Sequence, residues 1–132
     1  MKPVTLFLFL TLFTILSVRG QVIYVRSASS GSNNGTSWAN AYPSLQTALE
    51  AATSGKQIWV ARGTYKPTTG TDRSVSFQMK SGVKVFGGFA GNEISINDRD
   101  TSKNKTLIDG DNLYQCVKNY GTIDGFHVTK GK

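Results

Sequence analysis

Cysteine, histidine and long hydrophobic runs are scarce in this chain of 132 residues, and each scarcity excludes a class of protein. Cys116 is the only cysteine, which excludes an internal disulfide framework and a zinc site built on cysteines. His127 is the only histidine, and the alternation around it predicts a solvent-facing position in a strand rather than a catalytic base. Lys and Arg outnumber Asp and Glu by 15 to 8, yet no stretch gathers four of them, so we expect no nucleic-acid partner.

The one long apolar run lies at the start of the chain and has the plan of a secretory signal. Lys2 precedes the run Val4–Val18, and small and polar residues close it at Gly20. The run is shorter than the roughly 20 residues that cross a bilayer core, although an uncleaved membrane anchor is the alternative. We therefore expect residues 1–20 to be a signal peptide, cleaved after Gly20. The product would be secreted or held at the outer cell surface, with no transmembrane span left.

Residues 21–56 predict a strand, a polar loop and one helix. Gln21–Arg26 is rich in β-branched and aromatic residues, and residues 27–36 are a Ser/Gly/Asn loop. A helix is expected from Pro43, with Gly55 ending it in a left-handed conformation. Its apolar residues recur on one narrow face, at Leu45, Ala48, Leu49 and Ala52.

After Gly55, short β-rich segments recur at intervals of about 20 to 25 residues. The clearest are Ile58–Ala61, Val83–Phe86, Thr106–Ile108 and Ile123–Val128, with weaker ones at Val75–Met79 and Tyr114–Val117. Turn-like fragments lie among them, at Arg62–Tyr65, Gly87–Phe89, Asp109–Asp111 and Asp124–Phe126. Such spacing predicts an all-β solenoid, in which stacking of coils buries the apolar faces. An antiparallel sandwich is the alternative, since regularly spaced strands also suit it.

Several motifs resemble the N-terminal region of secreted bacterial right-handed parallel β-helix repeat proteins of pectate-lyase-like fold. The motifs are Asn34–Tyr42 (NGTSWANAY) with the Leu45–Leu49 pattern that follows, Gln57–Tyr65 (QIWVARGTY), Gly82–Gly91 (GVKVFGGFAG), Thr106–Asp111 and Thr122–Phe126. The resemblance implies a right-handed parallel β-helix with a short N-terminal capping α-helix. It also implies that residues 57–132 are the first coils of a β-helix truncated at its C-terminus, with the remaining coils as their partner. Enzymes of the family carry their catalytic residues on later coils, and no residue here matches such a motif.

Two functions are compatible with these observations. The first is an exported β-helix module, non-catalytic in this chain, that serves as a scaffold for adhesion or contact with polysaccharides or cell-surface glycans. The second is the N-terminal part of a polysaccharide lyase or glycoside hydrolase. Fold alone does not choose between them, because function depends on a site. Nothing in the sequence of residues 21–132 predicts a convergent acid, base or metal cluster, which favours the scaffold.

Candidate site residues are few. Trp38, Trp59 and Tyr65 are aromatic residues that can stack on sugar rings, although packing within the fold is the alternative. Alternation around Trp59 places its side chain on the outer face of its strand. For metal binding, the weak candidates for Ca²⁺ are Asp109, Asp111 and Asp124, for which turn formation is the alternative. No other cofactor is expected.

Two further features are expected to be structural. Residues 87–91 (GGFAG) follow a strand but precede no helical pattern, so they predict a tight corner rather than a phosphate loop. Cys116 is expected to be a small core residue rather than a nucleophile.

Overall fold

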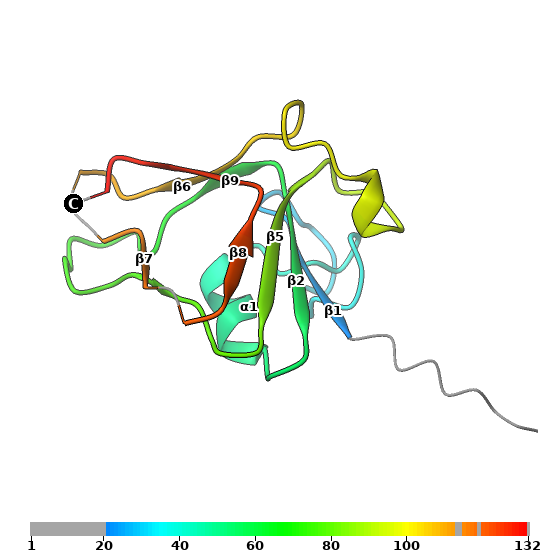
Figure 1. Ribbon diagram of the computed structural model, residues 1–132, viewed down its shortest axis with the longest axis horizontal. Coiled ribbons are helices and arrows are strands. Elements are labelled where there is room, and N and C mark those ends of the chain that lie inside the picture. The colour runs from blue at the N-terminus through cyan, green and yellow to red at the C-terminus, as the bar shows by residue number, and fades with distance from the viewer. Residues whose placement is uncertain (1–20, 113–114, 119, 132) are drawn as a thin grey trace, which may run out of the picture.

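Strands of β-branched and aromatic residues pair in parallel throughout this protein. The computed structural model describes residues 21–112, 115–118 and 120–131, so the predicted signal peptide lies outside the described residues. The largest sheet has the order β1 (Val22–Val25), β2 (Gln57–Ala61), β5 (Lys84–Phe89) and β8 (Thr122–Asp124). Figure 1 shows these four strands side by side, running from blue to red across the sheet.

Two smaller sheets follow the same progression along the chain. One has the order β3 (Gly63–Tyr65), β6 (Thr106–Asp109) and β9 (Phe126–Thr129). The other pairs β4 (Phe77–Gln78) with β7 (Val117–Lys118). Every strand pair in the described part of the chain is parallel, so the antiparallel sandwich is wrong. The fold is mostly β, with parallel sheets and one α-helix, as the sequence predicts at this level.

The register of the large sheet aligns side chains in rows across the strands, and the row on the inner face is aliphatic throughout. Ile23, Ile58, Val85 and Ile123 are successive partners, and they form one inner row. Tyr24, Trp59, Phe86 and Asp124 form the neighbouring row on the outer face. Because side chains alternate along a strand, the inner row packs into the core while the outer row faces away from it. The predicted outward direction of Trp59 is therefore confirmed.

Burial along these rows falls at the last strand. In the smaller sheet the partners Tyr65, Ile108 and Val128 are 4%, 0% and 57% exposed. In the large sheet Val85 is fully buried, whereas its partner Ile123 is only half-buried. No described strand pairs with the outer side of β7, β8 or β9. The end of the stack formed by β7, β8 and β9 is therefore open, and we call it the last rung.

The opposite edge, at β1, is covered by the chain itself. The Tyr24 amide donates to the Gly35 carbonyl at 3.0 Å, and the Tyr42 amide donates to the Tyr24 carbonyl at 2.9 Å. The Arg26 amide in turn donates to the Tyr42 carbonyl at 2.9 Å. The loop after β1 thus satisfies the outer backbone groups of the strand, as edge strands require.

The helix α1 (Leu45–Ala51) contacts β1, β2 and β4 through the predicted apolar face. The four residues of that face, Leu45, Ala48, Leu49 and Ala52, are at most 2% exposed. Its predicted ends are wrong. The first helical residue is Leu45 rather than Pro43, and Ser44 is the N-cap, whose hydroxyl accepts from the Thr47 amide. The last carbonyls are capped by the Lys80 ammonium, 2.9 Å from the Glu50 oxygen and 3.1 Å from that of Ala52.

Three strand predictions need correction. The fragment Arg62–Tyr65, expected to be a turn, contains β3, which pairs with β6. The segment Ile123–Val128, expected to be one strand, is divided into β8 and β9 by Gly125 at φ +79°. The predicted corner at Gly87-Gly88 lies within β5, where the register with β2 shifts between Trp59 and Ala61. Such a bulge adds a residue to one strand, and a glycine with positive φ permits it.

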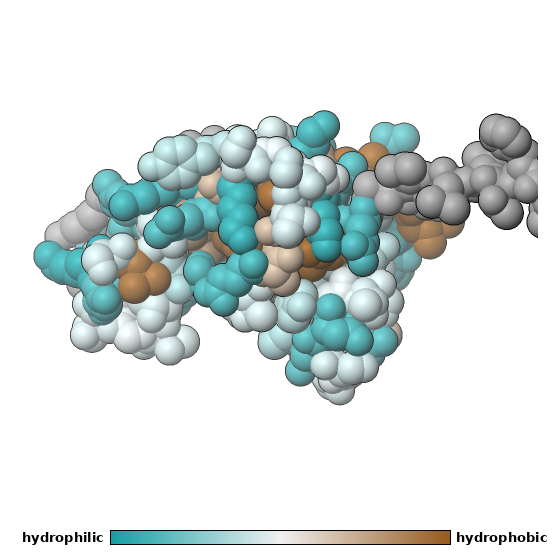
Figure 2. Space-filling model, turned by 90° about the horizontal axis from the view of Figure 1, so that it is seen from below, coloured by the Kyte–Doolittle hydropathy of each residue, from teal (hydrophilic) through white to brown (hydrophobic). Residues whose placement is uncertain are grey.

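The surface is mixed in character. In the space-filling view of Figure 2, hydrophobic residues form separate brown patches among neutral and hydrophilic ones. Within the described residues, no helix is long and apolar enough to cross a membrane.

Candidate functional site

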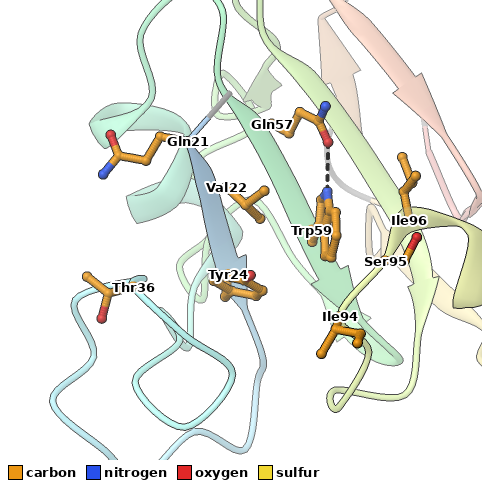
Figure 3. A pocket seen from close by; sticks show the side chains of 9 residues that line it. All are labelled: Gln21, Val22, Tyr24, Thr36, Gln57, Trp59, Ile94, Ser95 and Ile96. Atoms are coloured by element: carbon orange, nitrogen blue, oxygen red, sulfur yellow. Dashed lines mark hydrogen bonds between the residues drawn. The ribbon is translucent and has the colours of Figure 1, made fainter. Parts of the chain in front are cut away.

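A groove of about 570 Å³ lies over the outer face of β1 and β2 (Figure 3). We call it the β1–β2 groove. Its lining combines aliphatic and aromatic side chains with amides and hydroxyls, and consists of Gln21, Val22, Tyr24, Thr36, Gln57, Trp59, Ile94, Ser95 and Ile96. The volume falls in the range of about 300 to 1,000 Å³ that is usual for small-ligand sites.

The parallel register builds the floor of the groove. Val22 is the partner of Gln57, and Tyr24 is the partner of Trp59, so four outward side chains form a block across β1 and β2. The Trp59 indole Nε1 donates to Gln57 Oε1 at 2.9 Å, which fixes the orientation of both side chains (Figure 3). The floor is therefore a pre-formed surface of aromatic carbon beside a side-chain amide.

The segment Glu93–Ile96 forms one wall, and Glu93 anchors it twice. The Glu93 carboxylate accepts from the backbone amides of Ala90, Gly91 and Asn92 at 2.5, 2.9 and 3.0 Å. The Glu93 carbonyl accepts from the Trp38 indole at 2.9 Å. Beyond this anchor, Ser95 caps a short 3-10 helix, Ile96–Asp98, in a capping box with Asp98.

The anchoring of Glu93 predicts a pH dependence. Burial raises the pKa of its carboxyl, but the hydrogen bonds from Ala90, Gly91 and Asn92 outweigh this and hold the pKa below its ordinary value of 4.5. The pKa of Glu93 is lower in the folded protein than in the unfolded chain. The stabilisation that its carboxylate gives the fold is therefore fully present above the unfolded pKa and is lost as pH falls through the folded pKa. We expect the backbone amide NMR signals of Ala90 and Gly91 to titrate with a midpoint below pH 4.5.

The variant Glu93→Gln provides the control, because it removes the titrating group and should abolish this transition. A midpoint at or above pH 4.5 in the parent protein would contradict the anchoring role of the carboxylate.

The three residues predicted to contact glycans lie in different surroundings. Trp59 is only 6% exposed, because it stacks on Phe89 at 4.8 Å and meets Tyr24 edge-on at 5.8 Å. Tyr65 is 4% exposed, and its hydroxyl donates to the Ala61 carbonyl at 2.8 Å. Trp38 is half-buried and packs edge-on against Tyr24 at 4.9 Å. Tyr65 is outside the groove lining, Trp59 forms part of the floor, and Trp38 supports the wall through Glu93.

The three aspartates considered for Ca²⁺ are paired with separate cations. Asp111 is 3.2 Å from Lys66, Asp109 is 3.6 Å from Lys130, and Asp124 forms an ion pair with Arg99. The Asp111 backbone amide and the nearby lysines hold the pKa of Asp109 below its ordinary value, against the effect of burial. In the described part of the chain, no group of three or more His, Cys, Asp or Glu side chains is placed to hold a metal ion.

Cys116 and His127 occupy the predicted kinds of position. Cys116 is 6% exposed and belongs to the core, where burial, helped by the nearby Asp109 charge, raises the pKa of its thiol. His127 is exposed in β9, and its side chain points to the opposite face of the strand from those of Phe126 and Val128. The core position of Cys116 and the exposed position of His127 are as predicted, and neither residue lines the β1–β2 groove.

Sequence reasoning missed the wall of the groove. Residues 92–99 (NEISINDR) have no apolar periodicity, so nothing predicted that they fold back over β1 and β2. One local signal was present, since Ser95 and Asp98 match the capping-box pattern of a short helix. The exposure of Ile94, at 92%, becomes evident only in the structure.

No family model, no curated protein and no solved structure matches this chain.

Proposed function

We propose that this chain is the N-terminal portion of a right-handed parallel β-helix that acts outside the cell as a rigid scaffold for adhesion or glycan contact. The observation that carries the proposal is the in-register alignment of aliphatic side chains along the inner face of the parallel strands. Aligned rows of this kind are typical of solenoids, in which each coil buries the apolar face of its neighbour. The helix α1 would cap the first coil, consistent with its buried apolar face.

The two ends of the stack support a role as the start of a longer solenoid. The β1 edge is covered by the backbone of the following loop, whereas Val128 at the last rung is 57% exposed. Its row partner Ile108 is fully buried, because β9 covers it. One further coil with an apolar residue above Val128 would bury it in the same way. The partner of the last rung is, in this proposal, the remaining coils of the β-helix.

Glycan contact is the part of the proposal that a binding assay tests. The full chain is expressed with export, and the secreted protein is mixed with insoluble cellulose, chitin and calcium pectate. We expect retention on at least one polysaccharide, without release of soluble sugar. An unrelated small protein of similar positive charge controls for attraction by net charge alone.

The assay also separates the two functions considered. Failure to bind any polysaccharide above the charge control would contradict glycan contact. Release of soluble or unsaturated sugar by the purified protein would contradict the scaffold and support a lyase or hydrolase.

A further inference from the structure

We infer that Gln21, as the first residue of the exported protein, is a modification site that cyclises to pyroglutamate and so closes the amino terminus in front of β1. The inference goes beyond the proposed function. It rests on the cleavage after Gly20 that the sequence predicts, and on the surroundings of Gln21 in the fold.

The reaction is intramolecular, and its atoms balance without a co-reactant. The α-amine nitrogen of Gln21 attacks its own side-chain carbonyl carbon, Cδ, and a bond forms that closes a five-membered lactam. The bond from Cδ to the side-chain nitrogen breaks, and this nitrogen takes one amine proton and leaves as ammonia. An α-amine is partly uncharged near neutral pH, so the nucleophile is present. Because both groups belong to one residue, they meet at a high effective concentration.

The fold leaves both reacting groups free. Gln21 is exposed, and β1 begins only at Val22. With the described residues, the Gln21 side chain forms no hydrogen bond or ion pair, and in Figure 3 it extends away from Gln57 and Trp59. The Gln21 carbonyl oxygen accepts from the Gln57 amide at 3.4 Å, but this oxygen takes no part in ring closure. Cyclisation therefore breaks no contact of the described fold.

A closed terminus would protect a strand that has no spacer in front of it. Aminopeptidases remove residues one at a time from a free α-amine, and chain termini are preferred sites of proteolysis. Ile23 and Val25 follow shortly after the expected terminus, are 7% and 0% exposed, and belong to the core. Trimming as far as Ile23 would remove the partner of Ile58 from the inner row. A lactam has no free amine, so this trimming would not begin.

Cyclisation also changes the rim of the β1–β2 groove. Gln21 is one of the residues that line the groove. In its open form it would bring a charged amine and a primary amide to the rim, whereas the lactam is neutral and offers a single N–H. The groove that meets a ligand outside the cell is, in this proposal, the one with the lactam at its rim.

The test is the intact mass of the secreted full-length product after incubation at neutral pH. We expect the mass of residues 21–132 less one molecule of ammonia, together with resistance to a broad-specificity aminopeptidase. Gln21→Glu is the matched control, because glutamate closes the same ring only by losing water, which is far slower at neutral pH. The variant should keep the full mass of residues 21–132, and aminopeptidase should remove at least its first residue.

A second measurement tests whether the fold leaves Gln21 free. Cleavage of the purified precursor by signal peptidase in vitro gives protein with an open Gln21, and loss of ammonia is then followed by mass. The synthetic peptide QVIYVR, residues 21–26, is the reference in the same buffer. We expect the two rate constants to agree within about threefold, because one hydrogen bond to either reacting group would slow the protein about fivefold. A larger retardation in the protein would overturn the inference.

The outcomes separate this inference from the proposed function. A secreted protein that begins at another residue, or that keeps an open Gln21 after incubation, would overturn the inference and leave the scaffold and glycan contact standing. Loss of ammonia in a protein that binds no polysaccharide would contradict glycan contact and leave the inference intact.

Discussion

Replacing Ile58 by alanine should lower the free energy of unfolding by about 4 kcal/mol, as buried isoleucines do when truncated to alanine. Ile58 is fully buried at the centre of the inner row, with Ile23 on one side and Val85 on the other. The neighbouring strands β1 and β5 are hydrogen-bonded to β2, so they cannot move freely to fill the cavity that alanine would leave. Small domains are stable by only about 5 to 15 kcal/mol, so this loss is a large share. Urea unfolding followed by tryptophan fluorescence measures it.

The same substitution in the same row provides the control. Ile123 lies on the last rung and is only half-buried, so Ile123→Ala should cost about 1 kcal/mol. Equal costs at the two positions, or a larger cost at Ile123, would contradict the stacking order. Either result would mean that the inner row does not end at β8.

Replacing Gly88 by alanine should be almost as damaging, with an expected loss of about 4 kcal/mol. Gly88 has φ +93°, and a β-carbon there would lie 2.6 Å from Thr101 Cγ2 and 3.1 Å from its Cα. The strain of a left-handed conformation adds to this overlap, and the neighbouring backbone must move to relieve it. The bulge that brings Phe89 onto Trp59 would be distorted as a result.

Gly55 separates the strain from the overlap. It has nearly the same φ, +90°, but nothing lies within 4 Å of a β-carbon built there. Gly55→Ala should therefore cost only about 1 to 2 kcal/mol, which is the strain alone. Thermal unfolding of both variants measures the difference, and equal losses would show that the Thr101 contact is not part of the fold.

The sequence predicted those features that depend on local patterns. Alternation in Ile58-Trp59-Val60 was enough to place Ile58 and Val60 in the core and Trp59 on the outer face. The apolar spacing of the helix predicted its buried face. In both cases a period of two or of 3.6 residues decides the direction of a side chain.

Other features depend on contacts between distant segments. The helix ends at Ala51, before Gly55, and Lys80, 28 residues beyond Ala52, binds the carbonyls at this end. Trp59 faces outward yet is buried, because the bulge in β5 brings Phe89 over it and Tyr24 packs beside it. The groove wall depends on the Trp38 bond to Glu93, which spans 55 residues. None of these contacts has a periodic signal, so sequence reasoning identified Trp59 but not the groove around it.

The central claim, that the strands stack in parallel and in register, is tested most directly by nuclear Overhauser contacts in the labelled, exported protein. In parallel sheets neighbouring strands are offset so that α-protons do not meet, whereas antiparallel sheets bring pairs of them close together. We predict amide-to-α-proton contacts between the β5 and β8 strands around the partners Val85 and Ile123, and between β6 and β9 around Leu107 and His127. Strong contacts between α-protons across either pair would contradict parallel stacking, and with it the proposed β-helix.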